Sequence, residues 1–146
     1  MVKYASILIE SSPDEAVGYL KQAADVGDEM AILNLVVLWS NGIGLPMDKK
    51  EGCKLYKMAA DRGNVDAMFN YAVMLEAGSG IEANLVEACK YYKMAADNNH
   101  VKAMNNLAIL LEKGVDIGAG VDEARRYYKM AADQGDKYAI DNLNKH

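Results

Sequence analysis

The nine residues YYKMAADNN, numbers 91–99, have close copies at three other places in the same chain. The copies are YLKQAADVG at 19–27, LYKMAADRG at 55–63 and YYKMAADQG at 127–135, so each begins 36 residues after the one before. A fixed period between about 20 and 50 residues is typical of stacked structural repeats. A single unit of that size cannot bury its apolar face alone, so the sequence predicts repeats that pack on one another.

Seven positions of the repeat hold the same residue in all four copies. In the third copy they are Glu87, Lys93, Ala95, Ala96, Asp97, Ala103 and Asn106, and the other copies match them at intervals of 36 without a gap. Repetition is therefore the main feature of this chain, and we expect the fold to follow from it.

Each repeat predicts two helices. In the third copy, apolar residues stand at i, i+3, i+4, i+7 and i+8 in the first segment and at i, i+4, i+7 and i+8 in the second, as on the buried face of a helix. The first set is Ala88, Tyr91, Tyr92, Ala95 and Ala96, and the second is Ala103, Leu107, Leu110 and Leu111.

Two columns of the repeat predict a tight turn between these helices. One holds residue types that tolerate the left-handed conformation after a helix C-terminus: Gly27, Gly63, Asn99 and Gly135. The next is mostly strong N-cap residues: Asp28, Asn64, His100 and Asp136. We therefore expect an all-α chain of helix-turn-helix repeats with no strands.

We expect one domain over 1–146, with a partial repeat at 1–11 and repeats at about 12–47, 48–83, 84–119 and 120–146. The first full repeat opens with a capping box of Ser12, Pro13 and Glu15. One apolar residue in each inter-repeat loop is expected to pack on the core: Leu45, Ile81 and Ile117. Near the other end, Asp141 and Asn144 occupy columns that are apolar earlier, as expected for an exposed terminal helix.

The composition is that of an ordinary globular domain, with 51% hydrophobic residues and a net charge of −5. No apolar run approaches the roughly 20 residues of a membrane span, and the start lacks the features of a signal peptide. We therefore expect a cytoplasmic protein without a membrane span. The pI of about 5.0 argues against a nucleic-acid partner, which requires a basic footprint.

The stretch EACKYYKMAADNN, followed by AMNNLAILLEKG, resembles the Sel-1-like repeat, a relative of the tetratricopeptide repeat. The resemblance covers residues 12–146 and includes the acidic residue and alanine that open the first helix, two aromatics, the alanine pair and the small turn. It implies a right-handed α-solenoid whose first helices line a concave surface. It also implies a role as a scaffold or adaptor for protein–protein interaction, without naming the partner.

Residues able to carry catalysis are scarce. His100 stands in the helix-start column and His146 is the last residue, and no serine or glycine-rich motif forms a nucleophile elbow or a phosphate loop. We therefore expect no enzymatic activity, no catalytic residue, no metal site and no cofactor.

Cys53 and Cys89 fill the same column of neighbouring repeats, so their helices are too far apart for a disulfide and both are expected to be thiols. A cysteine-rich branch of the resembled family pins each repeat with paired cysteines and has been linked to β-lactam binding. That branch implies the alternative function, a small-molecule or glycan-binding module or a hydrolase. This chain lacks the cysteine pairs.

The asparagine column of Asn34, Asn70, Asn106 and Asn142 allows two interpretations. A buried amide must be hydrogen-bonded, so each asparagine could tie down loop or turn backbone between repeats. Alternatively, the four amides could form a ladder that binds a ligand.

The exposed columns of the first helices predict a repeated basic and methionine-rich stripe. Methionine adapts to irregular apolar partners and basic side chains steer acidic ones, so we expect a protein or peptide partner here. A solvated face, partly neutralised by Asp61, Asp97 and Asp133, is the alternative. The candidate partner-binding residues are Lys54, Lys57, Met58, Lys90, Lys93, Met94, Arg126, Lys129 and Met130.

Overall fold

The computed structural model describes residues 13–40, 49–115 and 120–145, with side chains from residue 17 onward and up to residue 38 in the first segment. Within these ranges the chain forms helices and no strands. The helices are α2 (Pro13–Asp25), α3 (Glu29–Ser40), α4 (Lys49–Asp61), α5 (Val65–Ala77), α6 (Leu85–Asp97), α7 (Val101–Glu112), α8 (Gly120–Ala132) and α9 (Lys137–Asn144). The predicted all-α architecture is confirmed.

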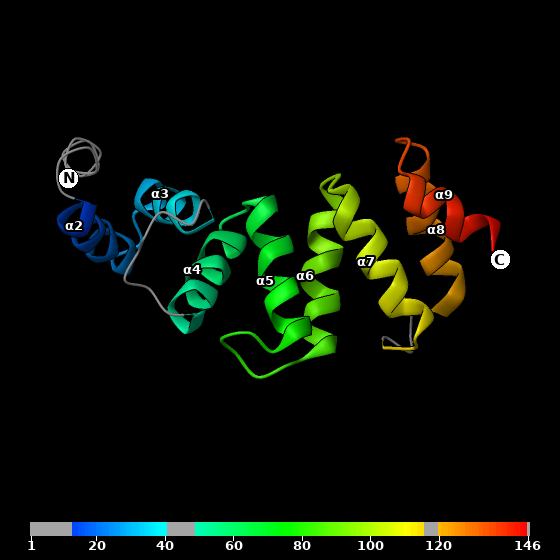
Figure 1. Cartoon of the computed structure of the whole chain (residues 1–146), viewed down its shortest axis with the longest axis horizontal. Coiled ribbons are helices and arrows are strands. Elements are labelled where there is room, and N and C mark those ends of the chain that lie inside the picture. The colour runs from blue at the N-terminus through cyan, green and yellow to red at the C-terminus, as the bar shows by residue number, and fades with distance from the viewer. Residues whose placement is uncertain (1–12, 41–48, 116–119, 146) are drawn as a thin grey trace.

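The helices stack in chain order into an elongated solenoid, with α2 near one end and α9 at the other (Figure 1). Each helix packs mainly against its neighbours in the sequence, α2 on α3, α3 on α4 and so on to α9. Nearest-neighbour packing is the rule in solenoids, since each repeat completes the core of the next. The first helices of the repeats are α2, α4, α6 and α8, and the second helices are α3, α5, α7 and α9.

The predicted turn after each first helix is confirmed in all four copies. At the end of α4, Gly63 N donates to Ala60 O at 3.0 Å and Asn64 N donates to Ala59 O at 3.1 Å. These two bonds make a Schellman motif, which requires a positive φ at its left-handed residue. That φ is 88° at Gly27, 95° at Gly63, 70° at Asn99 and 85° at Gly135.

The residue after each of these left-handed positions caps the second helix, as predicted. Side-chain acceptors of the column take a hydrogen bond from the backbone N–H three residues later, at 2.8 to 3.1 Å. The four N-caps are Asp28, Asn64, His100 and Asp136. The six residues that begin with AAD thus close one helix and open the next in each copy.

The repeated alanines lie in the core between the helices. Ala95, Ala96 and Ala103 are fully buried, and their equivalents in the other repeats are buried as well, apart from the half-buried Ala132 of α8. Cys53 and Cys89 are thiols, as predicted, and both lie inside the core. Burial raises the pKa of the Cys53 thiol, because it disfavours the charged thiolate.

Part of the predicted detail lies outside the described residues, namely the partial repeat at 1–11, Ser12, Leu45, Ile117 and His146. Within them, Ile81 packs half-buried against the core and α2 begins at Pro13. Asp141 and Asn144 are exposed on the short α9, as predicted. No helix in the part of the chain that the structure describes is both long and apolar enough to cross a membrane.

Candidate interaction surface on the first helices

All nine predicted partner-binding residues lie at the surface of α4, α6 and α8, three on each helix. The lysines and the arginine are exposed, and the three methionines are half-buried and pack against the core. We call this set the first-helix stripe. It consists of Lys54, Lys57, Met58, Lys90, Lys93, Met94, Arg126, Lys129 and Met130.

One cation of the stripe in each repeat is engaged by an acidic side chain. Lys57 donates to Asp61 at 2.8 Å, and Arg126 donates to Glu123 at 2.5 Å. Lys90 lies 4.0 Å from Glu87, a weaker ion pair. These pairs are exposed, so each contributes at most about 1 kcal/mol to stability.

The engaged arginine also lies over an aromatic ring. The Arg126 guanidinium is 4.5 Å from the centroid of Tyr127, within the range of a cation–π contact. The hydrogen bond from Arg126 lowers the pKa of Glu123, and the positive charge of Lys93 adds to that effect.

The second cation of each repeat is not engaged in this way. Within the described ranges, no carboxylate lies within ion-pair distance of Lys54, Lys93 or Lys129. The stripe therefore presents one available ammonium group per repeat, beside a half-buried methionine.

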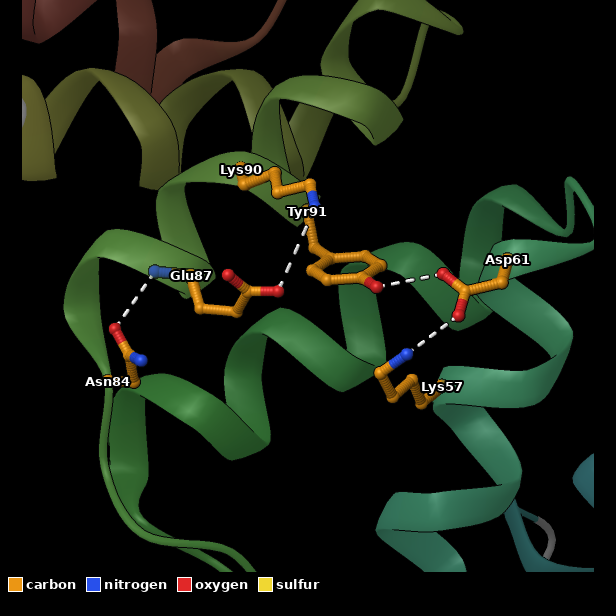
Figure 2. A network of polar contacts seen from close by, with 6 residues as sticks. All are labelled: Lys57, Asp61, Asn84, Glu87, Lys90 and Tyr91. Carbon is orange, nitrogen blue, oxygen red and sulfur yellow. Dashed lines mark hydrogen bonds and ion pairs between the residues drawn. The ribbon is translucent and has the colours of Figure 1, made fainter.

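Tyrosine side chains connect the first helices to one another, a feature that the periodicity does not predict. Tyr91 of α6 donates its hydroxyl to Asp61 at the end of α4 at 2.8 Å, as Figure 2 shows. The equivalent Tyr127 of α8 donates to Asp97 of α6 at 2.9 Å. The repeated aspartate therefore accepts a hydrogen bond from the following repeat at Asp61 and Asp97. Among the ion pairs of the described residues, the predicted pairing with the lysine four residues earlier is present at Asp61.

The pKa values of these groups follow from this geometry. Burial and the hydrogen bond to Asp61 raise the pKa of Tyr91 to about 12, and burial and Asp97 raise that of Tyr127 to about 12. Burial alone would raise the pKa of Asp61, but the hydrogen bonds from Lys57 and Tyr91 outweigh it and lower the pKa. Both hydroxyls thus stay protonated donors at neutral pH.

The second tyrosine of each pair bonds to the preceding second helix. Tyr92 donates to Glu76 of α5 at 2.7 Å, and Tyr128 donates to Glu112 of α7 at 3.1 Å. Burial is the main reason that the pKa values of both hydroxyls are raised. Two tyrosines in a row therefore hold one repeat to the two helices of the repeat before it.

One asparagine of the predicted column hydrogen-bonds to a tyrosine of its own repeat. Asn106 donates to the Tyr92 hydroxyl at 3.4 Å, a long contact within its own repeat. That the column ties down backbone between repeats stays a prediction. Asn70 lines a surface hollow of about 410 Å³ over the second helices, together with Phe69 and His100.

His100 has a structural role in the described contacts. Its Nδ1 accepts from Ala103 N at 3.1 Å, its Nε2 lies 3.5 Å from Asp66, and its ring stacks on Phe69 with 4.6 Å between centroids. Burial lowers the pKa of the imidazole, which keeps Nδ1 unprotonated as an acceptor. The described residues include no cluster of three or more histidine, cysteine or acidic side chains arranged to hold a metal.

A pocket of about 270 Å³ opens between α2 and α4, at the N-terminal end of the stripe. Its apolar lining is Ala24, Leu35, Leu55 and Met58, and its polar lining is Lys21, Asp25, Glu51 and Lys54. Lys21 of α2 and Glu51 of α4 form an ion pair of 3.0 Å at this boundary.

Comparisons with known proteins agree on the type of repeat. The family model of the Sel1 repeat matches residues 5–28, 39–64, 65–100 and 101–136, which together make up most of the chain. The matched segments end at residues 28, 64, 100 and 136, so they share the period of 36. Each ends directly before a second helix, whereas the repeats that we define begin before a first helix. No curated protein matches the chain.

Two solved structures are similar to the chain. A Sel1 repeat protein from Oxalobacter formigenes matches at 28% identity and a TM-score of 0.73, covering 98% of this chain and 59% of its own. The second is c5321, described as a protective antigen present in uropathogenic Escherichia coli strains that displays an SLR fold. It matches at 28% identity and a TM-score of 0.73, covering 89% of this chain and 28% of its own. The chain thus spans less than two thirds of either relative.

Proposed function

The chain belongs to the Sel1 repeat family, whose members are generally protein-interaction scaffolds, and on that premise we propose that it binds a protein or peptide segment across its first helices. The proposed role is a non-enzymatic adaptor. The proposed partner segment is extended or helical and carries both acidic and apolar residues.

One observation carries this proposal: each of α4, α6 and α8 presents one available lysine beside a half-buried methionine. The lysines are Lys54, Lys93 and Lys129, and the methionines are Met58, Met94 and Met130. An acidic residue of a partner would meet an ammonium group that no ion pair of the described structure occupies, and an apolar residue would meet a thioether that can adapt to it. Solenoids commonly use such extended surfaces for binding.

The test is a charge reversal of the three available lysines, Lys54→Glu, Lys93→Glu and Lys129→Glu, in one variant. Lys57 is left unchanged because its replacement would also disturb Asp61 and Tyr91. The partner is first identified by affinity capture from the native host and mass spectrometry, and its affinity is then measured at several salt concentrations. We expect the triple variant to bind at least about tenfold more weakly and with a shallower salt dependence, because three steering charges are lost and reversed.

A matched control makes the same three charge changes on the second helices and the turns beside them, at Lys102, Lys113 and Lys137, which are all exposed. Both variants should keep the wild-type circular dichroism spectrum and a similar Tm, since exposed substitutions usually cost no more than about 0.5 kcal/mol. Full binding by the first variant together with lost binding by the control would move the site to the second helices and overturn the proposal.

We also propose a reducing, cytoplasmic location. The support is that Cys53 and Cys89 are buried thiols on consecutive first helices, which suits a compartment where disulfides are not formed. Cell fractionation against compartment markers tests this, and recovery with a secreted fraction would contradict it.

A further inference from the structure

The boundary between α2 and α4 differs from the two later first-helix boundaries at one telling column. Tyr91 of α6 and Tyr127 of α8 each donate a hydroxyl to the aspartate of the preceding repeat. The same column of α4 holds Leu55, which has no hydroxyl. This is the boundary where the pocket of about 270 Å³ opens.

The pocket corresponds, column by column, to the surroundings of Tyr91. Every residue of its lining has an equivalent 36 positions later, and these are Lys57, Ala60, Asp61, Tyr71, Glu87, Lys90, Tyr91 and Met94. Five of them are drawn in Figure 2, where the Tyr91 hydroxyl points at the Asp61 carboxylate. Tyr91 also packs edge-on against Tyr71, with 4.7 Å between ring centroids. Between α2 and α4 both tyrosines are replaced by Leu35 and Leu55, so the space of a ring is left open.

The repeated aspartate is present at this boundary as Asp25, but the tyrosine that would donate to it is replaced by Leu55. Asp25 is exposed at the end of α2, and no side chain of the described residues donates a hydrogen bond to it. Beside it, Ala24, Leu35 and Leu55 present buried apolar surface. The pocket therefore combines an apolar floor with an acceptor at its edge, which is what a phenol requires.

We infer that this pocket receives the side chain of a tyrosine in the partner segment. Its ring would lie on Leu35, Leu55 and Met58, and its hydroxyl would donate to Asp25 as Tyr91 does to Asp61. A cavity of about 150 Å³ is large enough for benzene, so the pocket has room for a phenol. Tyrosine is also among the residues most enriched at the energetic centres of interfaces.

The third boundary shows that a tyrosine fits next to a leucine at this place. There the position of Leu35 is again a leucine, Leu107, and Tyr127 is nevertheless fully buried with its hydroxyl bonded to Asp97. A tyrosine from outside would thus meet the same neighbours as one that the chain supplies itself. That the tyrosine comes from a peptide rests on the proposed function, whereas the affinity of the pocket for a phenol does not.

The experiment uses two small probes that differ by one hydroxyl, N-acetyltyrosinamide and N-acetylphenylalaninamide. Each is titrated into the whole chain and followed by amide chemical shifts in NMR spectra. We expect the tyrosine probe to shift amides around Ala24, Asp25 and Leu55. The phenylalanine probe should bind about tenfold more weakly, since a hydrogen bond to a charged group is lost.

Two variants locate the probe. Leu55→Tyr fills the pocket from within, so it should abolish probe binding while raising the Tm, which also shows that the variant is folded. Asp25→Asn removes the charged acceptor and should bring the affinity of the tyrosine probe close to that of the phenylalanine probe. Equal binding of both probes, or unchanged binding by Leu55→Tyr, would overturn the inference.

The outcome is separable from that of the proposed function, because the probes are uncharged and need no partner. A variant with only Lys93→Glu and Lys129→Glu leaves the lining of the pocket unchanged, so it should bind the tyrosine probe about as the wild type does. Wild-type chain that self-associates in solution, with the association broken by Leu55→Tyr, would assign the pocket to a second copy and also overturn the inference.

Discussion

At the scale of single residues, the tyrosine–aspartate bond between repeats accounts for the aspartate that recurs in AAD. Tyr91 and Asp61 are 30 positions apart in the chain, as are Tyr127 and Asp97. Each bond crosses from one first helix to the next, so it fixes how successive repeats sit on each other. An aspartate that only capped its own helix or faced solvent would not need a hydrogen-bond donor 30 positions away in the sequence.

Replacing Tyr91 by phenylalanine should destabilise the chain by about 1 kcal/mol. The ring and its packing on Tyr71 remain, and only the hydrogen bond to a charged acceptor is lost. The loss falls below the usual value of about 1.5 to 3 kcal/mol because Asp61 is partly exposed. Urea unfolding measures the change. Tyr138→Phe is the control. Tyr138 is 72% exposed, so the loss of its hydroxyl should have no measurable effect on stability. Equal stability of both variants would mean that the bond contributes nothing.

His100 should make stability depend on pH in a range where the other N-caps do not titrate. Its pKa is lowered by burial; Asp66 opposes this shift and the charge of Lys102 adds to it. A lowered pKa means that the unfolded chain takes up a proton first as the pH falls. The contribution of the neutral imidazole is therefore complete above about pH 6.5 and is lost as the pH falls through the folded pKa.

The measurement compares wild-type chain with His100→Asn, whose amide keeps the N-cap as Asn64 does in the preceding repeat. Thermal unfolding between pH 7.5 and pH 5 should show a loss in the wild type of up to about 1 kcal/mol, the usual value of an N-cap, that the variant lacks. Parallel curves for the two proteins would show that the imidazole does not titrate with folding.

The sequence was a good guide to residues whose role is local. The left-handed column and the N-cap column were predicted from residue type alone, because both depend on the backbone within a few positions. The roles of Tyr91 and Tyr127 were not predicted, since periodicity shows which face of a helix is buried but not which residue of the next repeat it meets. One available signal was that their column holds tyrosine, which carries a hydroxyl, in three of its four copies and phenylalanine in none.

At the scale of elements, the turn between paired helices depends on one residue with positive φ. Gly63 has a φ of 95°, and an added Cβ there would meet no atom within 4 Å. A substitution to alanine would therefore change the backbone energy alone. The sequence predicted all four helix pairs because both the helices and the turns between them depend on residues close together in the chain.

Gly63→Ala should destabilise the chain by about 1 to 2 kcal/mol, the cost of the left-handed conformation for a residue with a Cβ. Gly18→Ala is the matched control within α2, where an added Cβ also meets nothing within 4 Å and φ is not positive. It should stabilise the chain by about 0.5 to 1 kcal/mol, because alanine is the better helix former. Both changes are measured by chemical unfolding. Effects of the same sign would contradict this account of the turn.

At the scale of the whole molecule, the boundaries between similar repeats differ where one repeat has a different residue in a shared column. Leu55 in a tyrosine column leaves a pocket at one boundary, while the equivalent spaces at the next two are filled. The stripe of lysines and methionines was predicted from a helical wheel. The division of its cations into engaged and available ones was not, because it depends on which acidic side chain three or four residues away on the same helix each cation contacts.

The central claim is that a partner binds along the first helices with an acidic and apolar segment. The most direct measurement is a selection from a large random peptide library displayed against the whole chain, the triple lysine variant and Leu55→Tyr. Peptides selected by the wild type should be enriched in acidic residues and tyrosine. The lysine variant should lose the acidic enrichment, and Leu55→Tyr should lose the tyrosine enrichment only. Selection of basic peptides, or the same peptides by the wild type and the lysine variant, would contradict the claim.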